Sequence, residues 1–267
     1  MIYVNELSKD FGRENNRTIV LNNVSWTASN GMITGLFGRK KSGKTVALRV
    51  LTGIQSFRHG QVLIDSRDIT EEFEDARSTF GYVPDTMDQF RALTGEQYLN
   101  FMSDVYGVDE DSRESFLKTW LPKLNLDLIL KDRMAGYTKG NYKKMLLLGA
   151  MIYEPNNLIL DNILEGLELQ DMESVKEILR EYARKGKTVF LADDRLRIAE
   201  NFCDHIIYLV NGRVRFKGSC ASMLEKYREA GSLDAIDRML SDEFERKRAE
   251  EQNTEEFGLR LFGRMRR

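Results

Sequence analysis

The stretch that decides the fold reads Ile33-Thr34-Gly35-Leu36-Phe37-Gly38-Arg39-Lys40-Lys41-Ser42-Gly43-Lys44-Thr45. Its first part is an apolar run typical of a buried strand, and it ends on Gly38. From Gly38 to Thr45 the chain follows the pattern G-x-x-x-x-G-K-[ST]. Apolar residues then continue without a breaker up to Gly53, which predicts a helix of about two to three turns. A chance glycine turn beside a lysine is the alternative, but the order of strand, loop and helix favours a phosphate-binding loop.

Each part of this loop has a role in holding nucleotide phosphates. Backbone N–H groups of the loop and of the helix N-terminus surround phosphate oxygens. The ammonium of Lys44 binds the β- and γ-phosphates, and the hydroxyl of Thr45 can ligate Mg²⁺. Lys41 stands where many such loops carry a further glycine, so that either phosphate binding is strengthened or the loop is strained. We therefore expect ATP and Mg²⁺ as cofactors, bound by Gly38, Arg39, Lys40, Lys41, Ser42, Gly43, Lys44 and Thr45.

Composition excludes several classes of protein. The 267 residues are 42% hydrophobic and 31% charged, with a net charge of −2, so nothing points to nucleic acid as a partner. The longest apolar runs fall far short of the ~20 residues that span a bilayer. The N-terminus lacks the pattern of a secretory signal, and the only cysteines are Cys203 and Cys220. We expect a cytoplasmic protein that reaches the inner face of the cell membrane only through a partner.

The order of apolar runs along the chain predicts an α/β protein. Short β-type runs come first, at residues 2–4, 18–21 and 24–26. Residues 93–147 have a helical pattern, with a helix start expected at Thr94-Gly95-Glu96-Gln97, and no convincing strand, which indicates an inserted helical lobe. Strand-like runs return at residues 158–160, 188–191 and 206–210, separated by helical segments. This alternation favours a mostly parallel sheet with crossover helices.

Five further segments carry candidate functional residues, namely Leu7-Ser8-Lys9-Asp10-Phe11-Gly12, Gly81-Tyr82-Val83-Pro84-Asp85, 93–101, Tyr137-Thr138-Lys139-Gly140-Asn141 and Leu158-Ile159-Leu160-Asp161. With the phosphate loop, they resemble the ATP-binding subunits of ATP-binding-cassette (ABC) transporters over residues 1–218. The similarity is to the exporter type, in which the membrane subunits are separate chains. The resemblance implies a P-loop NTPase cassette. Its parts would be a RecA-like, mostly parallel core sheet, an N-terminal antiparallel β-subdomain and an α-helical subdomain at about 88–150. Residues 219–267 would form a helical C-terminal extension.

The resemblance also implies a role for individual residues. Phe11 would stack on adenine, although a Phe in the core is the alternative. Asp161 would position Mg²⁺ through water. Asp85 stands where the family usually has a Gln that helps to hold Mg²⁺ and the attacking water and links the site to the membrane subunit. The implied Mg²⁺ ligands are therefore Thr45, Asp85 and Asp161.

The segment around Gly140 is in register with the family signature LSGGQ. In the family, this signature covers the γ-phosphate of ATP that is held by the opposite subunit. Thr138 keeps the hydroxyl and Gly140 keeps one glycine, but Lys139 replaces the other glycine and places a side chain where close backbone approach is expected. The implied partner is a second cassette, identical or different, whose site is completed in trans by Thr138, Lys139, Gly140 and Asn141.

None of the family's hydrolytic residues is intact. Asn162 replaces the Glu that polarises the attacking water, and an amide cannot take a proton. Asp194 replaces the switch His, which in the family contacts the γ-phosphate. The only histidines, His59 and His205, lie elsewhere and are expected to be structural. With Asp85, these positions carry two negative charges where the family usually has one. Because loss of a general base alone typically costs about 10²–10⁴-fold in rate, we expect ATP binding with weak or absent hydrolysis.

Two functions remain open. The first is a transporter subunit that binds Mg·ATP, dimerises and drives an attached transmembrane permease subunit. The alternative is a regulatory or scaffolding pseudo-ATPase subunit of a membrane complex. A soluble translation or DNA-repair cassette fits less well, because such proteins usually carry two cassettes or a long coiled-coil insertion, and the sequence shows neither.

The C-terminal extension is expected to begin with an amphipathic helix. Leu233, Ile236, Met239, Leu240 and Phe244 follow three- and four-residue intervals and form one apolar stripe. This stripe either covers the chain's own cassette or docks on a second subunit. Residues 257–267, which are basic with several apolar residues among them, either contact an anionic membrane surface or form a frayed end.

Overall fold

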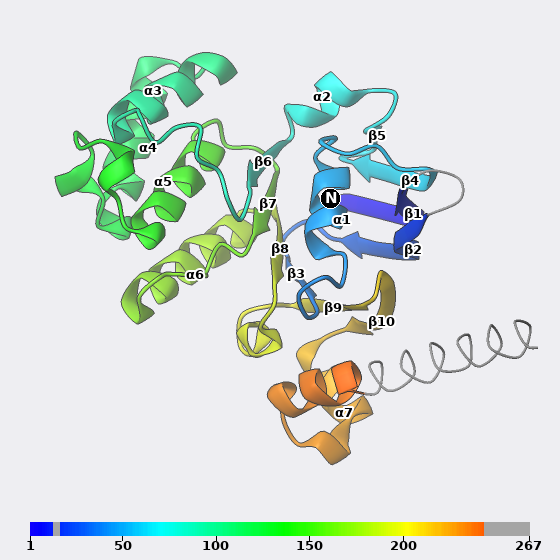
Figure 1. Cartoon of the computed structure of the whole chain (residues 1–267). Coiled ribbons are helices and arrows are strands. Elements are labelled where there is room, and N and C mark those ends of the chain that lie inside the picture. The colour runs from blue at the N-terminus through cyan, green and yellow to red at the C-terminus, as the bar shows by residue number, and fades with distance from the viewer. Residues whose placement is uncertain (13–16, 243–267) are drawn as a thin grey trace, which may run out of the picture.

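Two β-sheets and a helical lobe make up the part of the chain that the computed structural model describes, residues 1–12 and 17–242 (Figure 1). The lobe stands to one side of the larger sheet, and the smaller sheet stands on the other side. The phosphate loop, residues 38–45, belongs to the part of the chain that contains both sheets, not to the helical lobe.

The larger sheet has six strands in the order β10-β9-β3-β8-β7-β6. Its strands are β3 (Ile33–Phe37), β6 (Phe80–Val83), β7 (Asn157–Asp161), β8 (Thr188–Asp193), β9 (His205–Val210) and β10 (Arg213–Gly218). All neighbouring pairs are parallel except β9 and β10. Every residue of β3, β7 and β8 is buried, as expected for parallel strands that are covered on both faces. The predicted mostly parallel core sheet is confirmed.

The smaller sheet is antiparallel, with the order β2-β1-β4-β5. Its strands are β1 (Ile2–Phe11), β2 (Thr18–Ala28), β4 (His59–Ile64) and β5 (Arg67–Asp68). The two separate runs expected at 18–21 and 24–26 are wrong, because both belong to β2. The pairing of β1 with β2 contains register shifts, and Asn23 has a φ of 50°. Such an irregularity breaks the apolar alternation without ending the strand.

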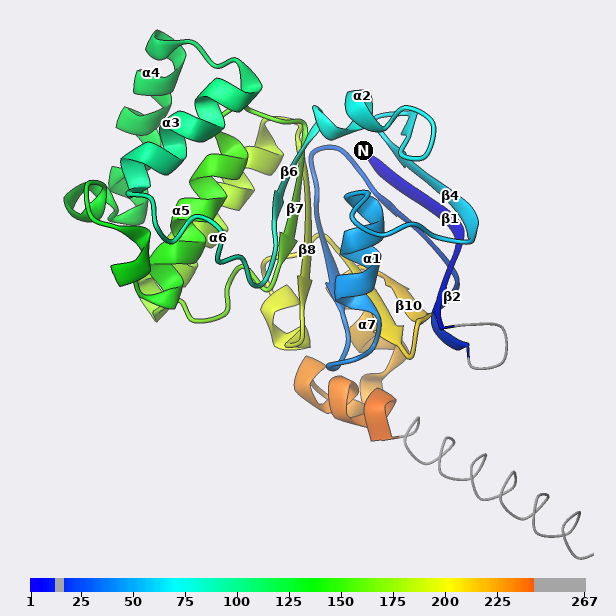
Figure 2. The same cartoon turned by 45° about the horizontal axis from the view of Figure 1, so that its top comes forward.

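Helix α1 (Lys44–Leu51) packs between the two sheets (Figure 2). Four of its side chains, those of Ala47, Leu48, Val50 and Leu51, are fully buried. They share one apolar core with residues of β1, β2 and β4 on one side and of β8 and β9 on the other. This packing holds the phosphate loop, which leads into α1, against the edge of the larger sheet.

The helical lobe consists of α3 (Gly95–Tyr106), α4 (Glu110–Trp120) and α5 (Lys139–Met151). Its first helix starts where the sequence predicts, because Thr94 and Gln97 form a capping box. Two more helices flank the core: α2 (Phe73–Arg77) precedes β6, and α6 (Leu169–Arg184) covers the face of the larger sheet that is opposite to α1. The helical lobe is inserted between β6 and β7, and its last helix ends at Met151.

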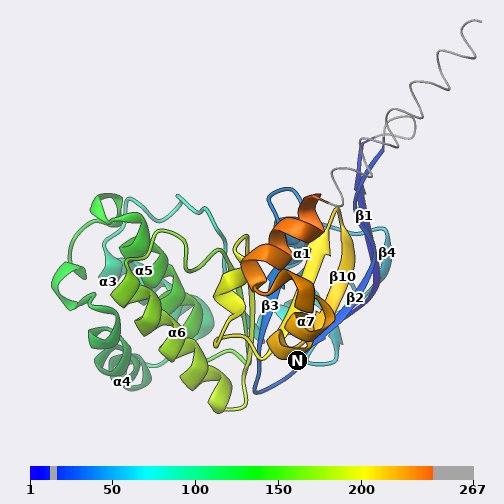
Figure 3. The same ribbon diagram turned by 90° about the horizontal axis from the view of Figure 1, so that it is seen from below.

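The described part of the C-terminal extension packs on the chain's own cassette (Figure 3). It contains α7 (Cys220–Lys226) and a helix that begins at residue 233 and includes residue 242. Leu233, Ile236 and Leu240 are buried in a second apolar core, which also contains side chains of the helical lobe and of α6, whereas Met239 is 38% exposed. Residues 243–267, which include Phe244 and the basic stretch 257–267, lie outside the described residues.

The buried stripe of this helix generates a stability prediction. Replacing Ile236, which is fully buried, by Ala should lower the free energy of unfolding by about 2–5 kcal/mol, because it removes buried methyl groups and leaves a cavity. Met239→Ala on the same helix should change it by less than about 1 kcal/mol. Urea unfolding of the full chain measures both values. Equal, small effects of the two variants would show that the helix does not stabilise the cassette.

Candidate functional site

A cavity of about 830 Å³ lies at the carboxyl ends of the parallel strands β3, β6, β7 and β8. This edge is where open α/β sheets bind ligands. From the phosphate loop and α1, the cavity is lined by Lys40, Lys41, Gly43, Lys44, Thr45 and Val46. From the other strand ends it is lined by Asp85, Asn162, Glu165 and Asp194, and on the opposite side by Thr18, Ile19, Val20 and Asn211. The sequence-predicted loop and all three replaced catalytic positions therefore meet at one site.

Two glycines allow the loop to turn tightly against the sheets. A Cβ at Gly38, whose φ is 147°, would lie 2.2 Å from the carbonyl oxygen of Leu209. At Gly43, with a φ of 109°, a Cβ would meet the carbonyl oxygen of Val20 at 2.9 Å. Lys41 has no such freedom, yet its φ is 68°. The residue in place of a third glycine thus adopts the left-handed conformation at a cost of about 1–2 kcal/mol.

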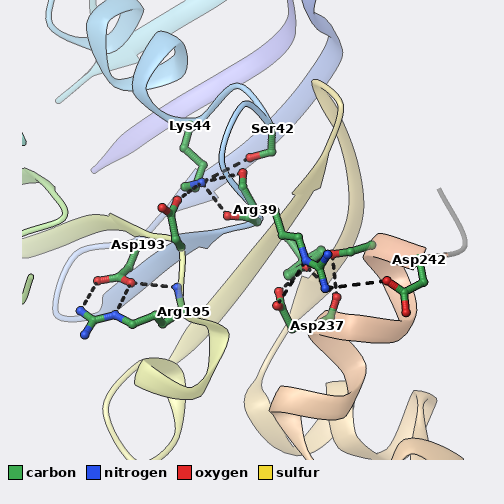
Figure 4. Close-up of polar contacts among 11 residues, drawn as sticks. Arg39, Ser42, Lys44, Asp193, Arg195, Asp237 and Asp242 are labelled. Atoms are coloured by element: carbon green, nitrogen blue, oxygen red, sulfur yellow. Dashed lines mark hydrogen bonds and ion pairs between the residues drawn. The ribbon is translucent and has the colours of Figure 1, made fainter. Parts of the chain in front are cut away.

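Lys44 is held by the loop and by one carboxylate. Its Nζ donates to the carbonyl oxygens of Gly38 and Arg39 at 2.5 and 3.0 Å and lies 2.7 Å from Oδ1 of Asp194. The side chain of Lys44 is 5% exposed and that of Asp194 is 30% exposed. Figure 4 shows Lys44 directed toward the loop, whereas the neighbouring Asp193 pairs with Arg195. The residue at the switch position therefore contacts the phosphate-binding lysine directly.

Arg39 points away from the cavity and toward the C-terminal helix (Figure 4). Its guanidinium lies 3.9 Å from carboxylate oxygens of both Asp237 and Asp242. Asp237 in turn accepts a hydrogen bond of 2.5 Å from the hydroxyl of Tyr208 on β9. In this arrangement Arg39 ties the loop to the extension, and the lysines of the loop provide the positive charge on the cavity.

Asp161, the last residue of β7, is buried close to Thr45 and Lys44 and is not among the residues that line the cavity. It is 1% exposed, and neither of its oxygens accepts a hydrogen bond among the described residues. Burial raises the pKa of Asp161 to about 6, and the charge of Asp85 adds to this rise, although the nearby Thr45 hydroxyl and the Lys44 and Lys143 ammonium groups oppose it. A buried carboxylate without a partner is costly unless a ligand satisfies it.

Lys143 on α5 is a site residue that the motif comparison does not assign. Its Nζ donates to Oδ1 of Asp85 at 3.0 Å and to the carbonyl oxygen of Asn162 at 2.5 Å, and its side chain is 3% exposed. Burial acts to raise the pKa of Asp85, but hydrogen bonds from Lys143 and Asn162 and the charges of Lys143 and Lys139 outweigh it and lower that pKa. The expected excess of negative charge is therefore smaller than a count of acidic residues suggests.

The signature segment does not reach the phosphate loop of its own chain. Thr138 and Asn141 line a separate cavity of about 350 Å³ in the helical lobe. The hydroxyl of Thr138 accepts a hydrogen bond from the backbone N–H of Asn141 at 3.1 Å and so caps α5. Lys139 pairs with Glu165 at 2.8 Å, and Gly140 lies so close to Gly166 that a Cβ would be 2.9 Å from its carbonyl oxygen.

The remaining candidates lie outside the cavity wall. Phe11 ends β1 and is 39% exposed, so the alternative that it belongs to the core is wrong. It pairs in the sheet with Thr18, which lines the cavity, and Lys9 lies 4.7 Å from its ring centroid. His59 begins β4 and His205 begins β9, and neither lines the site.

Comparisons with known proteins agree with this architecture. The sequence model described as ABC transporter matches residues 21–165. The ABC-type transporter ATP-binding protein EcsA of Bacillus subtilis is 29% identical over 219 residues, which cover 82% of this chain and 89% of that protein. An uncharacterized ABC transporter ATP-binding protein of Methanocaldococcus jannaschii is 27% identical over 233 residues, covering 87% of this chain and 83% of that protein.

Solved structures have the same fold. One described as the structure of an ATP binding subunit of an ABC transporter superposes with a TM-score of 0.78 at 27% identity, covering 85% of this chain and 93% of that chain. A dimeric bacterial ABC transporter cassette superposes with a TM-score of 0.73 at 20% identity, over 82% and 98% of the respective chains. The family match, the two-sheet cassette and the phosphate loop at the sheet edge agree, and the chain belongs to the ABC transporter family as one of its nucleotide-binding cassettes.

Proposed function

We propose that this chain is an ATP-binding transporter subunit that binds Mg·ATP in the 830 Å³ cavity and hydrolyses it weakly or not at all. The observation that carries the proposal is the complete phosphate loop beside the unpartnered carboxylate of Asp161. The exposed phenyl ring of Phe11 and the neighbouring residues of β2 supply the side of the site that would face the base.

The residues present fit a Mg²⁺ ion that is held partly by phosphate. Mg²⁺ in nucleotide sites is usually bound by one or two carboxylates together with substrate phosphates and water. Asp161 offers two oxygens that no described residue satisfies, and the hydroxyl of Thr45 lies near them. Within residues 1–12 and 17–242, no group of three His, Cys, Asp or Glu side chains forms a metal site without phosphate. Asp85, which Lys143 engages, is the weakest of the three predicted ligands.

Weak hydrolysis is supported by the polar groups around the place of the attacking water. The side-chain amide of Asn162 cannot accept a proton. The backbone carbonyl oxygen of the same residue accepts a hydrogen bond from Lys143. Asp194 carries a negative charge where a hydrogen-bond donor to the γ-phosphate is needed. Asp85 is ionised and paired, so its lowered pKa makes it a poor base.

A second cassette would complete the site. The exposed Thr138 lines a different cavity from the phosphate loop, and the exposed Lys139 beside it pairs with Glu165 and does not line the nucleotide cavity. In a dimer with the same or another cassette, they would face the partner's γ-phosphate. A partner with intact catalytic residues would then hydrolyse ATP while this chain mainly binds it.

An apolar groove of about 480 Å³ supports docking of a transmembrane permease subunit of the exporter type. It lies between the helical lobe and the region around α2, and Ile54, Phe101 and Val105 on it are 60%, 46% and 55% exposed. Exposed apolar groups that gather in one groove typically mark an interaction site. Among the described residues, no helix is both long and apolar enough to cross a membrane.

The first prediction tests nucleotide binding. Lys44→Ala should weaken Mg·ATP binding about 10–100-fold, because charge-assisted hydrogen bonds to phosphate are lost. Isothermal titration of the purified chain measures the affinity, and Lys118→Ala, which changes an exposed lysine of α4, is the matched control. If the unmodified chain and the Lys44 variant give the same absent signal, the chain is not a nucleotide-binding subunit.

The second prediction concerns hydrolysis. Steady-state phosphate release by the chain alone should stay below about 0.1 s⁻¹, whereas typical enzymes reach about 1–10³ s⁻¹. Asn162→Glu should raise it less than about tenfold, since Asp194 remains and the new carboxylate would lie beside Asp85. Lys44→Ala gives the background. A rate of several per second from the unmodified chain would require another group to activate the water.

The third prediction follows from the raised pKa of Asp161. Its folded-state pKa of about 6 exceeds the unfolded value of about 3.9, so ionisation destabilises the nucleotide-free fold increasingly as pH rises from about 4 to 6. Asp161→Asn should therefore stabilise the chain at pH 7.5 by on the order of 2 kcal/mol while abolishing Mg²⁺-dependent binding. Urea unfolding with a chelator, at pH 7.5 and pH 4.5, measures the effect. A gain that is the same at both pH values contradicts the assigned cause.

A further inference from the structure

Asp194 occupies an unusual position for an acidic residue. It directly follows β8 and lines the nucleotide cavity, where its Oδ1 lies 2.7 Å from Nζ of Lys44. The other hydrogen-bond partners of this ammonium are two loop carbonyl oxygens and the hydroxyl of Ser42. Among the described residues, Asp194 is thus the only carboxylate paired with the phosphate-binding lysine.

Apart from the buried Asp161, which forms no ion pair among the described residues, the other acidic residues near the site pair with cations that do not belong to the phosphate loop. Lys143 pairs with Asp85 at 3.0 Å, Lys139 pairs with Glu165 at 2.8 Å, and Arg195 pairs with Asp193 at 3.0 Å. Among the described residues, the only ion pair of Asp194 is the one with Lys44, although the charge of the neighbouring Arg195 also acts on it. Its charge is therefore the one that competes directly with phosphate for the loop lysine.

This competition affects two nucleotides differently. A phosphate-loop lysine binds the β- and γ-phosphates, so the γ-phosphate of a triphosphate approaches the side of the ammonium that Asp194 now occupies. A diphosphate has no group there and leaves the Lys44–Asp194 pair in place. A triphosphate must separate the pair and then faces the released carboxylate at close range, where like charges repel strongly.

We propose that Asp194 is a specificity-determining residue that makes this site prefer a nucleoside diphosphate to the corresponding triphosphate. The proposal rests on the nucleotide-binding function proposed above and adds to it a selection at the γ-position. A subunit with this preference keeps its site in the diphosphate state until a high triphosphate concentration, or a partner cassette that closes over the γ-phosphate, outweighs the preference.

The test compares affinities, not activity. Isothermal titration with Mg·ADP and Mg·ATP on the full chain, at protein concentrations that keep it monomeric, gives the ratio of the two dissociation constants. We expect the unmodified chain to bind ADP at least about tenfold more tightly than ATP, and Asp194→Asn to lower this preference by about tenfold, which corresponds to about 1.4 kcal/mol. Chromatography of the recovered nucleotide verifies that ATP stays intact.

Three further variants separate the local effect from a general one. Asp194→Glu keeps the charge and should retain the preference for the diphosphate. Asp111→Asn removes the same charge from the exposed start of α4 and should leave the ratio unchanged. Because Asp194 is partly exposed, Asn is expected to be tolerated, and Asp194→Ser provides a second neutral variant.

The outcomes distinguish the two levels of the proposal. If the unmodified chain binds both nucleotides, and both neutral variants have the same ratio of ATP to ADP dissociation constants as the unmodified chain, the role of Asp194 is wrong while the nucleotide-binding function stands. If the unmodified chain binds neither nucleotide, the function itself is wrong, and the selection falls with it. A loss of the diphosphate preference in both neutral variants, and not in the Glu variant, supports the assignment.

Discussion

The packing of α1 between the two sheets is the constraint on which the site depends. Its buried side chains contact the antiparallel sheet on one side and the parallel sheet on the other, so the helix cannot shift without opening both halves of one core. The phosphate loop joins β3 to this helix and is therefore held at both ends by buried elements. Rigid support of this kind preorganises backbone N–H groups for an anion, which lowers the cost of binding.

Around this loop, charges are arranged in pairs. Asp85 pairs with Lys143, Asp194 with Lys44, and Glu165 with Lys139, whereas the oxygens of Asp161 accept no hydrogen bond within residues 1–12 and 17–242. Pairing with Lys143 lowers the pKa of Asp85, which makes this carboxylate a weak base toward water. The unpartnered Asp161 instead retains a high affinity for a cation or a proton. Under the proposed function, these local charges would favour binding over hydrolysis within one cavity.

The extension adds a connection that is not part of the nucleotide cavity. Arg39 of the loop lies near two carboxylates of the C-terminal helix, and one of these, Asp237, is also bound by Tyr208 of β9. The same helix buries Leu233, Ile236 and Leu240 in the second apolar core. The start of the phosphate loop and the packing of the extension are therefore coupled through a few neighbouring residues.

The sequence by itself determined the class of fold and the nature of the ligand. An apolar strand, a glycine loop with Lys44 and an apolar helix are local patterns, and local backbone geometry and periodicity make them readable without long-range contacts. The same is true of the helix start at Thr94, because a capping box is formed within four residues. The local pattern did not predict that residues 18–28 form the single strand β2, because the irregularity at Asn23 depends on the pairing of β2 with β1.

Only the tertiary structure decided which charges meet. Lys143 belongs to the helical lobe, and Asp85 follows a strand of the larger sheet. Because the two residues are far apart in the sequence, their positions along the chain do not predict their contact. Likewise, the position of Arg39 in the loop predicts a phosphate ligand, but in the structure its guanidinium lies near Asp237 and Asp242 of the C-terminal extension. Whether an acidic residue repels a phosphate or is neutralised by a neighbour depends on distances of a few ångströms between segments far apart in the chain, because electrostatic interactions fall off with distance in space and not along the sequence.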